Sequence, residues 1–326
     1  MSKIDIYQAV TDRILKLLDQ GTVPWRQPIN NKGAAGFPAN FVSGKPYRGI
    51  NVFLLACTAM MEGFSSSFWL TYKQAKERGG HVRRGEKSSP VVFWKRYATR
   101  DKDTGEEKTV PVIRLYNVFN ASQCEGIETP DAAEAEDQAE PFEPIKQAAR
   151  IIEGYRQGPK VVTAGNQACY QPMSDTVRMP KPERFESPES YYTTYFHELA
   201  HSTGHSSRLD RGLDKRLRPF GSPDYSKEEL VAEMGAAFLA ASAGISPQTI
   251  DQSAAYIDGW RSKLKGDKKL VIQASGAGQR AADLILGLAW DEALKRTSND
   301  TEPTTPTASP TEPQADRANP PALAGP

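Results

Sequence analysis

The sequence of 326 residues predicts an α+β protein with two domains. Short β-rich runs alternate with amphipathic helical segments, three of the four histidines fall within nine residues of each other, and charge is distributed unevenly. Residues 1–127 hold 19 lysines and arginines against 11 acids, whereas residues 128–143 hold seven acids and no base. We expect a basic first domain over 1–127, an acidic linker over 128–143, a second domain over 144–297 and a disordered, proline-rich tail over 298–326.

The first domain is expected to begin with an amphipathic helix over residues 4–18, whose isoleucines, valine and leucines share one side. A second helix covers residues 51–62, and Thr71 is placed to cap a short helix over 71–80. Two β-rich runs, separated by a charged turn at 101–105, predict a hairpin formed by residues 91–97 and 110–119.

The second domain is expected to contain a helix over 145–157 and then three short strands, over 159–163, 167–171 and 175–179. A helix from about residue 188 to 203 follows these strands. Three further helices are predicted over residues 226–239, 254–264 and 279–294.

The sequence predicts neither a membrane-spanning protein nor an exported one. No run approaches the roughly 20 apolar residues that a membrane span requires, and the first residues carry no apolar signal core. The cysteines are odd in number and widely spaced, which favours a reducing cytoplasm over a disulfide framework. They are Cys57, Cys124 and Cys169.

The second domain carries an H-E-x-x-H motif, His197-Glu198-Leu199-Ala200-His201. Residues four apart on a helix share a face, so both histidines can bind one metal ion. Glu198 lies one step around the helix, where it can deprotonate a metal-bound water. Ser187 can cap the helix and Gly204 can end it. The motif in this context predicts a zinc-dependent hydrolase; the alternative is a surface helix with two hydrogen-bonded histidines.

A catalytic zinc site needs a third protein ligand. The metzincin spacing requires a histidine where this chain has Ser207, so that pattern fails. The helical segment that opens at Ser226 contains Glu229 and Glu233, which resemble the E-x-x-A-[D/E/N] element of gluzincin-type metallopeptidases. That resemblance implies that Glu229 is the ligand and that Glu233 orients a ligand histidine. The alternatives are Glu233 or Asp210 as the ligand, with Glu229 instead completing a capping box begun by Ser226.

Aromatic residues interleaved with lysine and arginine in the first domain are typical of single-stranded nucleic-acid binding, because bases stack on the rings and cations follow the phosphates. The alternative is that the aromatic residues of the strands face the core and the excess charge is solvated. Loops that contain glycine or proline favour exposure. The candidates for DNA contact in such loops are Trp25, Arg26, Lys45, Tyr47, Arg48, Arg83, Arg84 and Lys87.

These segments together resemble the ArdC-type antirestriction proteins of conjugative plasmids. The second domain resembles the zincin-like metallopeptidase domain of that family through residues 197–201 and 229–233. The first domain resembles the family's N-terminal domain in five segments, namely Val23-Pro24-Trp25, Pro38-Ala39-Asn40, Lys45-Pro46-Tyr47-Arg48-Gly49-Ile50-Asn51, Thr71-Tyr72-Lys73-Gln74-Ala75 and Val82-Arg83-Arg84-Gly85-Glu86-Lys87.

The resemblance implies that the first domain binds single-stranded DNA and that the protein protects incoming plasmid DNA from host restriction enzymes during conjugation. By analogy with zincin-like folds, residues 173–180 border the substrate groove. Two other hypotheses stay open. The protein is a protease recruited to cut DNA-bound proteins such as a restriction enzyme, or a binding module in which the metal only holds the fold. Zn²⁺ is the expected ion, and Mn²⁺ or Co²⁺ are alternatives for a His₂Glu site.

Overall fold

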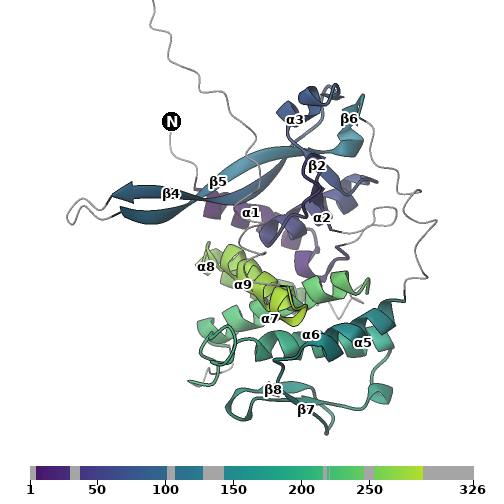
Figure 1. The fold of residues 1–326 in the computed structure, drawn as a ribbon, viewed down its shortest axis with the longest axis vertical. Helices are drawn as coiled ribbons and strands as arrows, with labels where there is room; N and C mark the ends of the chain where they lie inside the picture. The colour runs from purple at the N-terminus through teal and green to yellow at the C-terminus, as the bar shows by residue number, and fades with distance from the viewer. Residues whose placement is uncertain are drawn as a thin grey trace, which may run out of the picture.

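The computed structural model describes residues 5–29, 37–100, 107–127, 143–215, 219, 221–245 and 253–288. Helices and strands are mixed in sequence, which confirms the predicted α+β class (Figure 1). The predicted tail and all of the predicted linker except Glu143 lie outside the described residues. Among the described helices, none is both long enough and apolar enough to cross a membrane.

The N-terminal part, residues 5–127, contains a mixed sheet with the strand order β1-β2-β5-β4 and a separate antiparallel pair, β3-β6. Its helices begin with α1, and Thr71 caps α3 through a full capping box with Gln74, as predicted. Its elements are α1 (Ile6–Asp19), η1 (Pro24–Arg26), β1 (Ala39–Asn40), α2 (Ile50–Glu62), β2 (Phe68–Leu70), α3 (Tyr72–Glu77), β3 (His81–Val82), β4 (Ser89–Arg100), β5 (Glu107–Asn120), η2 (Ala121–Gln123) and β6 (Cys124–Glu125).

The predicted hairpin is confirmed and is longer than expected. β4 and β5 pair antiparallel from Ser89 opposite Val118 to Arg100 opposite Glu107. Asn51 fixes α2 to the base of this hairpin, because its amide donates to the carbonyl oxygen of Val92 at 2.7 Å and its Oδ1 accepts from the Val92 amide at 2.8 Å. The far end of the hairpin extends away from the helices as an arm (Figure 1).

The C-terminal part, residues 143–288, packs helices on one side of a three-stranded sheet with the order β7-β9-β8. β7 runs parallel to the central strand β9, and β8 runs antiparallel to it. The elements are α5 (Pro144–Gly154), β7 (Lys160–Thr163), β8 (Cys169–Gln171), η3 (Pro172–Ser174), β9 (Thr176–Met179), η4 (Pro182–Arg184), α6 (Pro188–Ser202), α7 (Pro223–Ser242), α8 (Ala254–Gly266) and α9 (Leu270–Ile285).

Two predicted helix starts are wrong. α7 begins at Pro223, and the Ser222 hydroxyl oxygen caps it by accepting from the Tyr225 amide at 3.2 Å. Ser226 therefore lies inside the helix and begins no capping box, which removes that alternative role of Glu229. The serine-proline pair at 222–223 is itself a helix-start signal. α9 begins at Leu270, nine residues before the predicted start.

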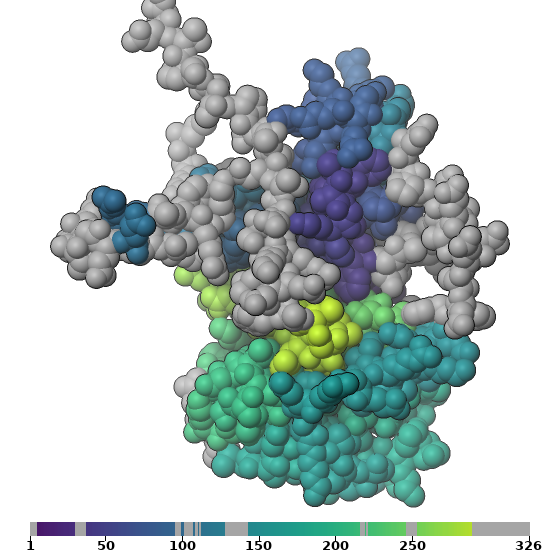
Figure 2. All heavy atoms as spheres, viewed as in Figure 1, coloured from purple at the N-terminus to yellow at the C-terminus, as the bar shows by residue number. Residues whose placement is uncertain are grey.

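One continuous hydrophobic core joins the two parts. It includes Val10 and Phe53 from the N-terminal part and Phe238 and Ile285 from the C-terminal part. The rings of Phe53 and Phe238 lie 4.9 Å apart between centroids. In Figure 2 the purple and blue atoms of the N-terminal part rest directly on the green and yellow atoms of the C-terminal part. The two predicted domains are thus packed together as one body.

A second set of contacts between the parts is polar. Arg48, just before α2, forms an ion pair with Asp283 of α9, whose side chain is buried. The amide of Gly49 donates to Oε1 of Gln279, and Gln279 in turn donates to Asp283 at 3.2 Å. The turn that enters α2 is therefore bonded to a helix of the C-terminal part.

Close packing of α7 against α9 depends on glycine, and we predict that Gly278→Ala destabilises the protein. A Cβ at Gly278 would lie 2.9 Å from the Gly235 amide nitrogen and 3.0 Å from the Val231 carbonyl oxygen, so backbone must move. The expected loss is about 1–3 kcal/mol, measured by urea unfolding. A matched control is Gly259→Ala on α8, where nothing lies within 4 Å and alanine should stabilise the helix by about 0.5–1 kcal/mol. Equal stability of the two variants would contradict the packing argument.

Candidate metal centre

The side chains of His197, His201 and Glu229 converge between α6 and α7. One ligand atom from each residue lies within 4.8 Å of the ligand atoms of the other two. Among the described residues, these three form the group that could hold a metal ion. Nε2 of His201 lies 3.1 Å from Nε2 of His197. The Glu229 oxygens lie 3.4 Å from Nε2 of His201 and 3.6 Å from Nε2 of His197. Two imidazoles and a carboxylate facing one point are a donor set that fits a divalent metal ion.

Glu228 fixes the orientation of one of these imidazoles. Its Oε1 lies 3.4 Å from Nδ1 of His201, so a proton stays on that nitrogen and Nε2 is the nitrogen that can bind a metal ion. Arg211 clamps the same carboxylate through Nε at 2.9 Å and Nη2 at 2.7 Å. Burial alone would raise the pKa of Glu228, but His201 and Arg211 together lower it to about 2. Glu228 is therefore ionised at neutral pH.

The prediction that Glu233 orients a ligand histidine is wrong. Glu233 lies one turn beyond Glu229 and faces the N-terminal part. Its Oε2 accepts from Nε1 of Trp25 at 2.8 Å and from the hydroxyl of Tyr256, and Nε of Arg26 lies 3.6 Å away. The guanidinium of Arg26 also stacks over the ring of Tyr256, 3.7 Å from its centroid. Glu233 thus links the helix that carries Glu229 to η1.

Glu198, the predicted general base, lies between the metal helix α6 and the strand β8. The Tyr170 amide in β8 donates to Oε2 of Glu198 at 2.7 Å, and the Glu198 side chain is largely buried. Among the strands that the structure describes, β8 pairs with β9 alone, so it is an edge strand. The prediction that residues 173–180 border the groove is wrong for β9, since β7 and β8 occupy both of its edges. The edge next to Glu198 belongs to β8.

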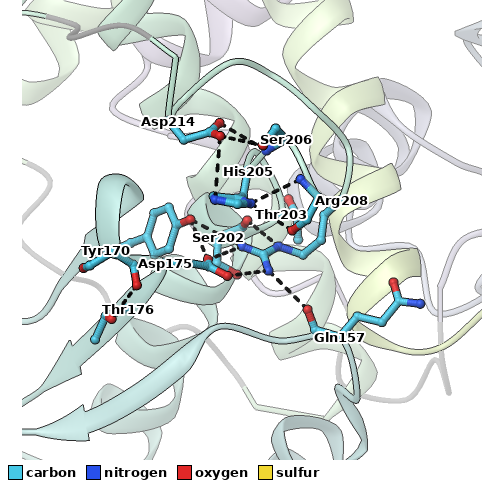
Figure 3. A network of polar contacts seen from close by, with 12 residues as sticks. Gln157, Tyr170, Asp175, Thr176, Ser202, Thr203, His205, Ser206, Arg208 and Asp214 are labelled. Carbon is cyan, nitrogen blue, oxygen red and sulfur yellow. Dashed lines mark hydrogen bonds and ion pairs between the residues drawn. The ribbon is translucent and has the colours of Figure 1, made fainter.

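A partly buried polar network holds β8 against the C-terminal end of α6 (Figure 3). The Tyr170 hydroxyl donates to Oδ1 of Asp175 at 2.8 Å. Arg208 forms an ion pair with Asp175, with Nη1 3.0 Å from Oδ2, and its Nε donates to the Ser202 carbonyl oxygen at 2.8 Å. Burial and Asp175 raise the pKa of Tyr170, so its hydroxyl remains a donor. The network therefore fixes the strand whose backbone contacts Glu198.

Tyr225, in the first turn of α7, interacts with the ligand Glu229 and with Glu198. Burial, followed by Glu229 and Glu198, raises its pKa to about 12, so the phenol keeps its proton. His205 instead contacts Ser207 at 2.8 Å, in the loop after α6. Of the alternative ligands, Asp210 is outside the cluster: both of its oxygens accept from Nζ of Lys215 at 2.8 Å.

The expected exposure of the DNA-contact candidates is wrong for half of them. Trp25 is 2% exposed and its ring meets Trp260 edge to face, while Tyr47 packs in the core. Arg26 and Arg48 are half-buried and pair with Glu233 and Asp283 of the C-terminal part. The glycine- and proline-bearing loops that carry these residues are covered by the C-terminal part, which sequence spacing does not reveal.

The other candidates lie nearer to solvent. Lys45 is half-buried, and Arg83 pairs with Glu86 at 2.7 Å. Arg84 and Lys87 are exposed. DNA contact by these four residues stays a prediction.

Two family models match this chain, one on each side of the acidic segment 128–143. Residues 4–119 match the N-terminal domain of anti-restriction factor ArdC, and residues 147–277 match a zincin-like metallopeptidase family. The metal-free crystal structure of the antirestriction ArdC protein from the R388 plasmid is 40% identical in sequence. It superposes with a TM-score of 0.68, over 86% of this chain and 97% of that one. The chain belongs to the ArdC family of antirestriction proteins.

Other relatives agree with membership of the ArdC family. The Mn(II)-bound structure of the R388 protein is 37% identical and covers 91% of this chain, again with a TM-score of 0.68. Protein y4eC of Sinorhizobium fredii is 33% identical over 290 residues, 86% of this chain and 91% of that protein. An Escherichia coli DNA primase TraC is 34% identical over 302 residues, 87% of this chain. The chain spans only about a fifth of the length of that primase.

Sequence reasoning missed two groups that position the centre. Glu228 and Arg211 carry no motif of their own, and Glu228 is adjacent to a residue already assigned as a ligand. One signal was available, namely the two consecutive acids in α7. Adjacent helix positions point in different directions, so one acid can bind the metal while the other accepts a hydrogen bond from a ligand histidine. The backbone amide of Tyr170 left no signal in the sequence.

We predict that Glu228→Gln weakens binding of Zn²⁺ or Mn²⁺ by about 10- to 100-fold, because neutral glutamine no longer holds the proton on Nδ1 of His201. The matched control is Glu233→Gln on the same helix. Because Glu233 faces the N-terminal part, this variant should change metal affinity by less than about threefold. Isothermal titration calorimetry measures both, and circular dichroism checks that each variant folds. A larger loss in Glu233→Gln would restore the role predicted from sequence.

We also predict that metal affinity rises with pH. Burial opposes protonation of His201, but Glu228 and Glu229 outweigh it and raise its pKa to about 10 in the metal-free protein. Binding below that pH must therefore release a proton from His201, and apparent affinity should rise up to about tenfold per pH unit between pH 6 and 8. Calorimetry in buffers of different ionisation enthalpy counts the released protons. A flat affinity profile with no proton release would contradict this.

Proposed function

We propose that this protein protects incoming plasmid DNA from host restriction enzymes, by binding single-stranded DNA and by hydrolysing peptide bonds at a metal centre. What supports the hydrolytic part most directly is the placement of Glu198. A structural zinc site usually has four protein ligands, whereas three ligands with a further carboxylate nearby are typical of a catalytic site. Membership of the ArdC family supports the protective role.

The proposed chemistry assigns a role to each group. A divalent ion bound by His197, His201 and Glu229 would supply Lewis acidity, which polarises a carbonyl and acidifies water. Zn²⁺ is the proposed ion, and Mn²⁺ and Co²⁺ are alternatives. Glu198 accepts a proton from the attacking water and delivers it to the leaving amine. We propose the phenol of Tyr225 as the donor to the developing oxyanion.

The edge of β8 that does not pair with β9 suggests how a substrate binds. A peptide in extended conformation can add to an unpaired strand edge and form main-chain hydrogen bonds. β8 presents such an edge beside Glu198, since its other edge pairs with β9. We therefore propose an unfolded or extended segment of a DNA-bound protein as substrate, with a restriction enzyme as one candidate. All three cysteines are free thiols, which agrees with action in a reducing cytoplasm.

The test is Glu198→Gln, which removes the base and keeps the ligands. Peptidase activity on unfolded proteins should fall by about 10²- to 10⁴-fold. Protection of plasmid DNA transferred into a restricting host should fall to the level without the protein, while metal content stays unchanged. The matched control is Glu189→Gln in the first turn of the same helix, which should keep full protection. Full protection by metal-loaded Glu198→Gln would show that DNA binding alone protects, and would overturn the hydrolytic part.

A further inference from the structure

We propose that an exposed ring on the hairpin, together with lysines from the end of α8 and from the turn that leads into α9, forms a platform for single-stranded DNA. A base would stack on Trp94, and the phosphates would lie along Lys265 and Lys269. The proposal rests on the single-stranded DNA binding proposed above, and it gives that binding a location. The residues of this platform differ from the loop residues that the sequence predicted, and they come from both parts of the molecule.

Trp94 differs from the other tryptophans that the structure describes. Trp25, Trp69 and Trp260 are buried in the core, whereas Trp94 is 48% exposed. It lies in the middle of β4, opposite Ile113 of β5. Its ring meets Tyr7 of α1 at 6.4 Å between centroids and 60° between planes. Such an edge-to-face contact holds the indole in place and leaves ring surface available to a base.

The cations beside this ring come from the C-terminal part. Residues 261–269 contain five basic residues and a single acid. Lys265, Lys268 and Lys269 are all exposed. Nζ of Lys269 lies 5.6 Å from the centroid of the Tyr7 ring. The turn therefore places positive charge next to the same aromatic pair.

Contacts with α1 hold this lysine turn in place. The hydroxyl of Thr11 donates to the carbonyl oxygen of Lys268 at 2.9 Å. Nζ of Lys268 donates to Oδ2 of Asp5 at 2.7 Å. Both contacts join the turn to the helix that carries Tyr7, so the spacing between ring and lysines is fixed by the fold. A fixed spacing suits a polymer in which bases and phosphates alternate.

Single-stranded DNA fits these features better than a duplex or a protein does. Only an unpaired base offers its ring face for stacking on an exposed side chain, and each such contact strengthens binding without regard to sequence. Lysines that follow the backbone add a salt-dependent contribution. In a duplex the bases stack on one another, so the exposed indole would gain nothing. An acidic protein could use the lysines but has no feature that requires the indole.

The experiment measures binding of the full-length protein to fluorescein-labelled oligo(dT) by anisotropy. Trp94→Ala should weaken binding by about 5- to 100-fold, and Trp94→Phe, which keeps a ring, should lose less. The matched control is Tyr72→Ala. Tyr72 is 61% exposed and also lies in the N-terminal part, on α3, at the opposite end of the hairpin from the arm (Figure 1). It should bind within twofold of the unaltered protein. Thermal melting by circular dichroism checks the fold of each variant.

A salt series tests the lysines separately. The double variant Lys265→Ala with Lys269→Ala should lower the slope of log affinity against log salt by about 1.4, since each phosphate contact to a single strand contributes about 0.7. The charge-matched control is Lys146→Ala with Lys160→Ala, on α5 and β7, far from the hairpin in Figure 1. That control should leave the slope unchanged.

The failures can be told apart. If the unaltered protein does not bind oligo(dT), the proposed function loses its DNA component. If it binds but Trp94→Ala binds equally well, the platform is wrong and the proposed function stands. Unchanged DNA affinity together with lost protection in Trp94→Ala would show that this surface docks a protein, which also overturns the platform.

Discussion

The metal centre depends on how closely α6 can approach α7. The two histidines come from one helix and Glu229 from the other, so the separation of the helices sets the geometry of the donor set. Gly235 permits that approach: a Cβ there would lie 3.0 Å from the Cβ of Ala200, which sits between the two ends of the H-E-x-x-H motif on the packed side of α6. Larger side chains at this crossing would separate the ligands, because packed interiors deform little.

α7 has two functions in successive turns. Glu228 and Glu229 face α6, where one orients His201 and the other completes the donor set. One turn later Glu233 faces the N-terminal part and bonds to Trp25 and Tyr256. The helix that supplies a ligand is therefore also the helix to which η1 attaches. α7 therefore connects the N-terminal part directly to the metal centre.

The continuous core changes how the functions are distributed. A chain of two independent domains would bind DNA with one and carry the metal centre on the other. Here Trp25 of an N-terminal loop packs against the C-terminal part. The exposed Trp94 contacts Tyr7, which lies beside Lys269 of the C-terminal part. DNA bound there would lie on the same packed unit as the edge strand β8. A DNA-bound protein and the centre could then meet without a flexible linker.

The sequence by itself determined the features that depend on local spacing. The i, i+4 histidines, the caps at Ser187 and Thr71 and the period-2 hairpin strands are set by residues a few positions apart, and the structure has them as predicted. Only the tertiary structure decided which of three neighbouring acids in α7 faces the metal, the imidazole or the N-terminal part. It also decided that Trp25 is buried while Trp94 is exposed. Those outcomes depend on which element covers each face, and the covering elements are up to about 230 residues away in the chain. A one-residue step on a helix turns a side chain by about 100°, so local pattern alone could not choose between them.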